Sequence, residues 1–306
     1  MKFISFLSVL FLSLTSHAQL PSVVSGKIER YAQFLSRYIS SRNVDVWLPD
    51  DYSTSKKYNV LYMHDGQMLF DAATTWNKQA WDVDDVVTDL LKNNKINDLI
   101  VVGIWNGGES RHADYFPQKP FMGLSDSTRE MIYAAGRTNG AGVFNNYKVR
   151  SDNYLLFLVK ELKPFIDSAY STHKNREHTF IAGSSMGGLI SLYAICEYPD
   201  VFGGAACLST HWPGIFSMEN NPVPAAFFKY MEIALPDPAT HKIYFDYGDA
   251  TLDALYPPLQ QQADERMKKR GYNTKNWLTK YFPGENHSEI AWNKRLHIPL
   301  TFLLGK

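Results

Sequence analysis

Short apolar runs recur along the chain and predict the strands of a buried sheet. Each run is rich in β-branched or aromatic residues and ends in turn-forming residues. This pattern is typical of parallel strands, because both of their faces are covered by other elements. The runs are Asn59 to Met63, Leu99 to Ile104, Thr179 to Ala182 and Ala205 to Leu208, with further strands expected at Lys242 to Tyr247 and Trp277 to Phe282.

Segments with helical periodicity separate these strands. The repeated order of strand, helix and strand predicts a doubly wound, mostly parallel sheet with helices on both faces. The fold class is therefore α/β. The expected helices are Asp82 to Leu91, Asn153 to Ile166, Gly188 to Tyr198 and the polar segment Gln260 to Arg270.

Two extended segments precede this alternation. Lys27 to Phe34 and Asn43 to Leu48 have the composition of strands, and the second ends in the turn cluster Pro49-Asp50-Asp51. They predict an opening antiparallel hairpin at an edge of the sheet. No internal repeat or linker rich in proline and glycine divides the rest of the chain. We therefore expect residues 19–306 to form a single domain.

The segment from Asn106 to Val149 breaks the rhythm of strands and helices. It carries many glycine, asparagine, arginine and aromatic residues but little periodicity. It follows the carboxyl end of a predicted strand, where ligands bind in open α/β sheets. A long insertion there predicts a wall or lid over a binding site, although a surface elaboration packed away from the chemistry is the alternative.

The first 18 residues have the layout of a secretory signal peptide. Lys2 is followed by an apolar run from Phe3 to Leu14 and then by the small-residue exit Ser16-His17-Ala18. A transmembrane anchor is the alternative, but an apolar run of about 12 residues is shorter than the ~20 that cross a bilayer. The sequence predicts cleavage near Ala18 and export to the periplasm or the medium.

Composition and charge exclude several classes of protein. With 45% hydrophobic and 20% charged residues, the chain is globular rather than disordered. Its 31 basic and 31 acidic residues balance and form no run of like charge, which argues against nucleic acid or an acidic lipid surface as a partner. The two cysteines, Cys196 and Cys207, cannot build a disulfide framework or a four-thiolate zinc site. They are expected to act as small buried hydrophobes, although export would permit a disulfide between them.

The sequence Gly183-Ser184-Ser185-Met186-Gly187 fits the pattern G-x-S-x-G. A predicted strand runs directly into it and a predicted helix runs directly out, which is the context of a nucleophile elbow. In such a turn the serine adopts a strained backbone conformation, and bulky residues two positions either side would collide. The arrangement predicts Ser185 as a nucleophile and the Met186 amide, at a helix N-terminus, as half of an oxyanion hole.

A serine hydroxyl needs a base, and the base needs an orienting carboxylate. His287 follows the last predicted strand in the loop Pro283-Gly284-Glu285-Asn286-His287, so it is the candidate base. Three aspartates lie near the end of the preceding strand: Asp246, Asp249 and Asp253. Asp246 is expected within the strand and Asp249 in the turn. Asp253 has the loop reach to meet the imidazole and is the favoured acid, with Asp249 as the alternative.

The second oxyanion donor is expected in the loop His64-Asp65-Gly66-Gln67 after the first buried strand. Gly66 lets the backbone turn its amides inward, and the N–H of Gln67 is the candidate donor. His64 beside Asp65 could instead form a metal ligand pair. No third ligand stands at suitable spacing, however, so we predict neither a metal nor another cofactor.

With these residues assembled, the chain resembles the putative esterase family of α/β-hydrolases, in particular its feruloyl esterase and enterochelin esterase-like branch. The resemblance implies an α/β-hydrolase fold and the same roles for Ser185, His287, Met186 and Gln67. The similar segments are Arg42-Asn43-Val44-Asp45-Val46-Trp47-Leu48-Pro49, the oxyanion loop, Phe180 to Gly188 around the elbow, and Gly284 to Glu289 around the histidine.

Four residues are candidate contacts for the substrate. The segment from Asn106 to Arg111 resembles a part of this family that borders the pocket, where Arg111 would clamp an anionic or phenolic group or tie the insertion to the sheet. Trp105, His211 and Trp212 also follow predicted strands. They would form aromatic walls around an aryl group or a sugar, or they would pack in the core.

The sequence thus predicts an exported serine hydrolase that cleaves a carboxylic ester through an acyl-enzyme. An acyltransferase on the same residues is one alternative, and a non-catalytic protein that binds carbohydrate or siderophore is another. Aryl esters on polysaccharide, acetylated sugars and siderophore lactones all fit as small-molecule or oligosaccharide substrates. The oligomeric state is not indicated by any pattern in the chain.

Overall fold

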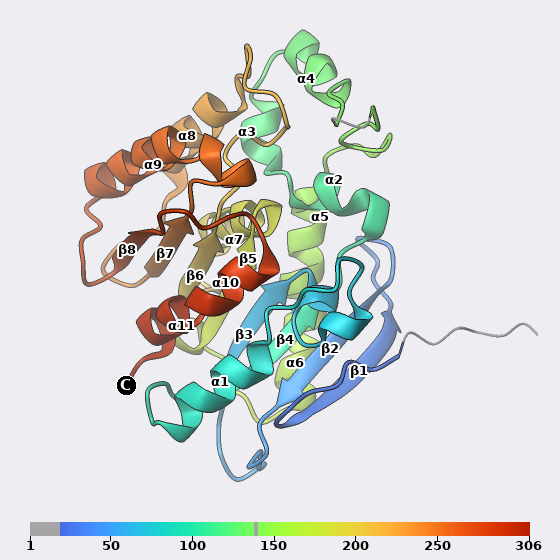
Figure 1. The fold of residues 1–306 in the computed structure, drawn as a ribbon, viewed down its shortest axis with the longest axis vertical. Coiled ribbons are helices and arrows are strands. Elements are labelled where there is room, and N and C mark those ends of the chain that lie inside the picture. The colour runs from blue at the N-terminus through green and yellow to red at the C-terminus, as the bar shows by residue number, and fades with distance from the viewer. Residues whose placement is uncertain (1–18, 138–139) are drawn as a thin grey trace, which may run out of the picture.

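Eight strands form one mixed sheet in the computed structural model, which describes residues 19–137 and 140–306 (Figure 1). The predicted signal peptide lies outside the described residues. The strand order is β1-β2-β4-β3-β5-β6-β7-β8. The strands are β1 (Lys27–Phe34), β2 (Arg42–Leu48), β3 (Asn59–His64), β4 (Leu99–Ile104), β5 (Thr179–Ser184), β6 (Gly204–Leu208), β7 (Lys242–Tyr247) and β8 (Trp277–Tyr281).

The directions of the strands agree with the predicted α/β-hydrolase architecture. β1 pairs antiparallel with β2, and β2 pairs antiparallel with β4. From β4 through β3 and β5 to β8, all neighbouring strands are parallel. The prediction of a mostly parallel sheet opened by an antiparallel hairpin is therefore confirmed. The carboxyl ends of six parallel strands meet at one edge of the sheet.

Helices cover both faces of this sheet (Figure 1). The helices are α1 (Val83–Lys92), α2 (Arg111–Tyr115), α3 (Gln118–Met122), α4 (Asp126–Tyr133), α5 (Ser151–Leu156), α6 (Lys163–Ala169), α7 (Met186–Glu197), α8 (Val223–Ala234), α9 (Pro257–Arg270), α10 (Glu289–Arg295) and α11 (His297–Leu304). The last two of these follow one another at the C-terminus. A π-helical turn, Phe157–Leu162, joins α5 to α6.

Alternation along the strands divides the core into two layers. In β3, Val60 and Tyr62 pack in one hydrophobic cluster, whereas Leu61 and Met63 pack in the other. Successive side chains of a strand point to opposite faces, so an all-apolar strand needs cover on both sides. The first cluster lies under α5, α7 and α8, and the second lies under α1 and α11.

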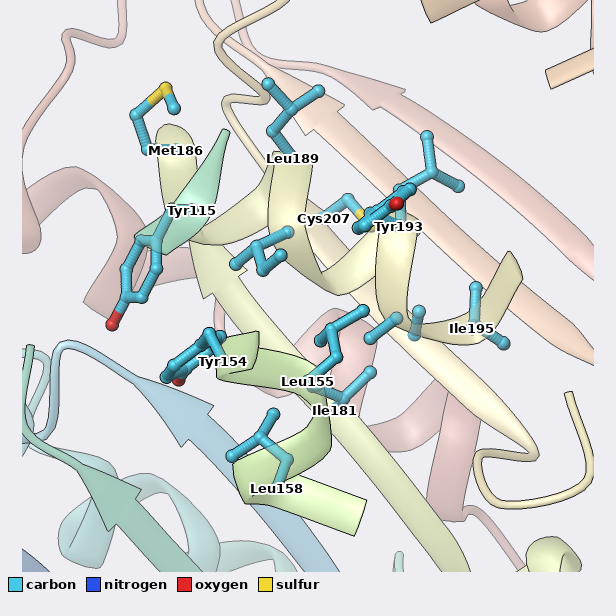
Figure 2. Close-up of a cluster of buried hydrophobic side chains, with 14 of the residues drawn as sticks. Tyr115, Tyr154, Leu155, Leu158, Ile181, Met186, Leu189, Tyr193, Ile195 and Cys207 are labelled. Carbon is cyan, nitrogen blue, oxygen red and sulfur yellow. The ribbon is translucent and has the colours of Figure 1, made fainter. Parts of the chain in front are cut away.

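Helix α7 is buried around its whole circumference. Every residue from Met186 to Cys196 is buried, as expected for a helix that is apolar on all sides. Figure 2 shows Leu189 and Tyr193 of this helix near Leu155 of α5 and Ile181 of β5. This packing fixes the N-terminal end of α7 directly after β5.

The segment from Asn106 to Val149 packs partly in the core and partly at the carboxyl edge of the sheet. Short helices α2, α3 and α4 lie within it, and much of it is anchored in the core by fully or nearly fully buried aromatic side chains. These anchoring side chains are Tyr115, Phe116, Phe121 and Phe144. The beginning of the segment reaches the carboxyl edge of the sheet.

The two cysteines behave as small buried hydrophobes. Cys196 in α7 and Cys207 in β6 are both free and buried. Burial raises the pKa of each thiol.

Within the described residues, no helix is both long enough and apolar enough to cross a membrane.

Candidate active site

Ser185 occupies a sharp turn between β5 and α7. Its φ is 58° and its ψ is −122°, a region of backbone space that a residue with a side chain rarely adopts. A Cβ on Gly183 would lie 2.8 Å from the carbonyl carbon of Gly187, so the turn closes only without a side chain there. A Cβ on Gly187 would lie 3.3 Å from the Cβ of His64. The local geometry is that of the predicted nucleophile elbow.

The residues predicted to supply the oxyanion hole line the same cleft as Ser185. Met186 is the first residue of α7, where the helix dipole favours negative charge. Gln67 lies in a 3-10 helix, Gly66–Met68, directly after β3. A Cβ on Gly66 would lie 2.5 Å from the carbonyl carbon of Gly103, so this glycine allows the loop to pack onto β4. The left-handed residue that turns the chain is Asp65, with φ 56°.

His287 is held by the carboxylate of Asp253. The His287 Nδ1 lies 2.6 Å from Asp253 Oδ1, and Asp253 is fully buried. The second oxygen, Oδ2, accepts hydrogen bonds from the Ser209 hydroxyl at 2.6 Å and the Gly248 amide at 2.8 Å. Burial raises the pKa of Asp253, but the contact with His287 and the hydrogen bonds from Ser209 and Gly248 together hold it below its ordinary value. The carboxylate is therefore ionised at neutral pH.

The other two aspartates near β7 have different partners. Asp249 is half-buried, and its carboxylate accepts hydrogen bonds from the Tyr281 hydroxyl and the backbone N–H of Gly284. It thereby shapes the loop that carries His287. Asp246 lies within β7, as expected from the sequence, and forms an ion pair with Arg295.

Arg111 ties the insertion to the loop after β3. Its Nε and Nη2 lie 2.6 Å and 2.7 Å from the two carboxylate oxygens of Asp65, and Asn106 donates to the same carboxylate at 2.7 Å. Burial raises the pKa of Asp65, but Arg111 and Asn106 hold it below its ordinary value. The bidentate contact with Asp65 corresponds to the second of the two predicted roles of Arg111, that of tying the insertion to the sheet. The Arg111 side chain also lines the cleft.

His64 is a buried, neutral imidazole. Its Nδ1 lies 2.7 Å from the Tyr154 hydroxyl, and burial lowers its pKa to about 3. Among the residues that the structure describes, no group of three or more His, Cys, Asp or Glu side chains is placed to hold a metal ion.

A cleft of about 430 Å³ lies at the carboxyl edge of the sheet and brings the candidate residues together. Its walls come from the loops after β3, β4, β5, β6, β7 and β8, which is where ligands bind in α/β sheets. Lining residues include Ser185, Met186, Gln67, His287, Arg111 and His211.

Two of the predicted wall residues do not line this cleft, and their placement corrects the sequence prediction. Trp212 is fully buried between Phe228 and Phe245, and its Nε1 donates to Gln260. Trp105 lies against β1 and β2, where its Nε1 donates to Asp45 and the guanidinium of Arg30 covers its ring. Both side chains satisfy structural contacts that the sequence pattern did not reveal.

Three other tryptophans take their place in the cleft: Trp76, Trp81 and Trp292. Trp76 is 83% exposed, which is unusual for so large an apolar side chain. It lies in the loop that follows the candidate oxyanion hole. The sequence signal for it is a tryptophan in a polar loop downstream of Gln67. Trp292 packs edge-on against His287, with ring centroids 4.9 Å apart.

His211 lines the cleft as a neutral imidazole. Its Nδ1 lies 2.9 Å from the hydroxyl of Tyr256, which is fully buried. Burial lowers the pKa of His211 well below its ordinary value, and the nearby His112 and His287 lower it further. Burial raises the pKa of Tyr256. The backbone N–H of His211 donates to the Ser185 carbonyl oxygen at 3.1 Å. A neutral pair of polar groups therefore adjoins the serine.

Comparison with known families decides the identity of this fold. Residues 36–297 match the family model described as Putative esterase. The chain belongs to the putative esterase family. As a member of this family, it is a carboxylic-ester hydrolase. The resemblance inferred from the sequence motifs is confirmed by this match.

Relatives of this putative esterase are distant in sequence but similar over their length. An uncharacterized protein, YbbA of Bacillus subtilis, is 22% identical over 273 residues, which are 87% of this chain and 94% of that protein. An IroE-like serine hydrolase from Shewanella oneidensis is 18% identical, with a TM-score of 0.65, over 91% of this chain and 80% of that one. A ferulic acid esterase from the anaerobic fungus Anaeromyces mucronatus is 20% identical, with a TM-score of 0.60, over 93% of each chain. These structures share the fold.

Proposed function

We propose that this putative esterase is an exported enzyme that hydrolyses a carboxylic ester through a covalent acyl-enzyme on Ser185. The observation that carries the proposal is the pairing of His287 with the buried, ionised Asp253 on the cleft that also holds the strained Ser185. A base oriented by a carboxylate, beside a serine on an elbow, is the arrangement that activates a hydroxyl. Residues 1–18 would direct the chain out of the cytoplasm.

In the first half of the reaction, His287 takes the proton of the Ser185 hydroxyl as its oxygen attacks the ester carbonyl. The backbone amides of Met186 and Gln67 stabilise the negative charge that develops on the carbonyl oxygen. His287 then returns the proton to the leaving alcohol, whose bond to the acyl carbon breaks. In the second half, a water molecule repeats the sequence and releases the acid, which restores Ser185. Asp253 keeps the imidazole oriented and stabilises its charged form throughout.

The substrate classes best suited to the cleft are aryl or acetyl esters of sugars and siderophore-type lactones. Three tryptophans and the neutral imidazole of His211 line it, together with polar side chains such as Asn77 and Glu289. Aromatic surfaces stack on aryl rings or on the apolar faces of sugars, and polar groups orient hydroxyls. The fold shared with a ferulic acid esterase supports the aryl ester among these.

Hydrolysis of p-nitrophenyl acetate and methyl ferulate by the mature protein tests the proposal. The wild type is expected to turn over at least one ester, and Ser185→Ala is expected to lose that turnover by about 10⁴-fold or more. A fluorophosphonate probe should label the wild type and not the variant. A folded wild type that neither hydrolyses an ester nor reacts with the probe would contradict the proposed function.

A further inference from the structure

The carboxylate of Asp253 is one end of a buried network centred on the hydroxyl of Ser209. This serine directly follows β6 and is fully buried. Its Oγ lies 2.6 Å from Asp253 Oδ2, 2.9 Å from the Trp292 Nε1 and 2.9 Å from Arg295 Nη2. Three chain segments far apart in the sequence therefore meet on one oxygen atom.

Elementary chemistry fixes the direction of all three hydrogen bonds. An indole N–H and a guanidinium can only donate, so the Ser209 oxygen must accept from both Trp292 and Arg295. These two bonds use both of its acceptor positions. Its single proton is then left for Asp253, whose ionised carboxylate can only accept. The hydroxyl has no alternative orientation in which all of its partners remain satisfied.

Arg295 is itself held in place behind this hydroxyl. It is buried, and its Nη2 lies 2.9 Å from Asp246 Oδ1. The backbone N–H of Ser209 donates to the same Asp246 oxygen at 3.2 Å. The guanidinium also packs over the ring of Phe282, with 4.9 Å to the centroid. A cation with this many contacts cannot swing away from Ser209 without breaking a buried ion pair.

We propose that Ser209 is a positioning residue that locks the Asp253 carboxylate in the orientation in which it holds His287. The oxygen of Asp253 that contacts His287 is distinct from the one that accepts from Ser209 and the Gly248 amide. Fixing Oδ2 on one side therefore fixes Oδ1 on the other. Accepting from a cation also polarises the Ser209 hydroxyl, which strengthens its bond to the carboxylate.

The backbone of Ser209 offers two ways to remove the hydroxyl. Its φ is 40°, a left-handed conformation that glycine adopts without strain. Ser209→Ala removes the hydroxyl and retains the Cβ, whereas Ser209→Gly removes it and suits the backbone. Ser151→Ala is the matched control, because Ser151 is also fully buried and lies outside the cleft. Its hydroxyl accepts a hydrogen bond from the backbone N–H of Gln118.

The test combines ester hydrolysis with the proton NMR signal of the His287 Nδ1–H, which reports the bond to Asp253. Both Ser209 variants should lower kcat by about tenfold to thirtyfold at unchanged KM and shift this signal, whereas Ser151→Ala should do neither. An unmoved signal in both Ser209 variants, or a kcat within twofold of the control, would overturn the proposal.

The kinetic part rests on the proposed esterase function, but the NMR part does not. If the wild type hydrolyses no ester and resists the fluorophosphonate probe, the proposed function fails. The signal of His287 in the Ser209 variants still decides whether this hydroxyl positions the carboxylate. The two failures are therefore distinguishable.

Discussion

The Nδ1 of His287 lies 2.6 Å from Asp253 Oδ1, although 34 residues separate the two along the chain. Asp249 lies only four positions before Asp253, yet its carboxylate is taken up by Tyr281 and Gly284. The short 3-10 helix Thr251–Leu255 turns the chain so that Asp253 faces inward. Burial and hydrogen bonding thus select Asp253, rather than the nearby Asp249, as the partner of His287.

This difference predicts opposite outcomes for two conservative substitutions. Asp253→Asn should lower kcat on the order of 10⁴-fold, because an amide no longer selects the reactive tautomer of His287. Asp249→Asn should keep activity within a few-fold and only loosen the loop. Steady-state kinetics on p-nitrophenyl acetate, with circular dichroism to verify folding, compares them. Equal losses in both variants would contradict the assignment of Asp253.

Gly248 is expected to be intolerant of even a methyl group. A Cβ there would lie 2.1 Å from the carbonyl oxygen of Glu285, in the loop that carries His287. Gly248→Ala should push this loop away from Asp253 and lower kcat/KM by about 100-fold, because small displacements of catalytic groups are costly. Gly123→Ala is the control, since its Cβ would lie 3.4 Å from the Pro120 carbonyl oxygen. Comparable kinetics in the two variants would show that the loop adjusts freely.

Trp76 is expected to contribute to binding rather than to stability. Its side chain is 83% exposed at the cleft, so Trp76→Ala should leave Tm nearly unchanged. Loss of one stacking surface should raise KM for methyl ferulate by about threefold to tenfold. Trp212→Phe should have the opposite effect, lowering Tm while KM stays constant. It removes the indole N–H that donates to the buried Oε1 of Gln260. An unchanged KM in Trp76→Ala would remove this indole from the substrate site.

Asp84 predicts a pH dependence of stability. It is buried, its Oδ2 accepts from the Val24 amide, and its Oδ1 has no hydrogen-bond partner among the described residues. Burial raises its pKa to about 6 from an ordinary value of 3.8. The folded state therefore binds a proton on the Asp84 carboxyl more tightly than the unfolded state does. The stability that protonation contributes is complete below pH 3.8 and is lost as the pH rises through 6.

Asp84→Asn removes the titration and so isolates this effect. At pH 8 the variant should be more stable than the wild type by about 1 to 2 kcal/mol, a figure reduced for solvent screening. At pH 3.5 the difference should vanish, because the wild-type carboxyl is then neutral as well. Thermal unfolding followed across this pH range gives the difference directly. An advantage that is equal at both ends would refute the raised pKa.

The local pattern of the chain determined the elements that carry the chemistry. Apolar runs and extended segments bounded by turn residues located all eight strands, since strand burial and turn formation depend on neighbouring residues. Gly183 and Gly187 on either side of Ser185 indicated the elbow for the same reason. The pattern does not indicate helices α2, α3, α4, α8, α10 and α11, because their exposed and buried positions are set by what packs against them.

Tertiary structure alone decided which side chains meet at the cleft. Trp105 and Trp212 follow strands just as a wall residue would, but partners distant in sequence draw them into structural contacts. Trp76 reaches the cleft from a loop with no periodic signal. The convergence of Ser209, Trp292 and Arg295 behind Asp253 likewise has no trace in local sequence. A strand or a tight turn is fixed by adjacent residues, whereas a site is fixed by distances between elements that only the packed core defines.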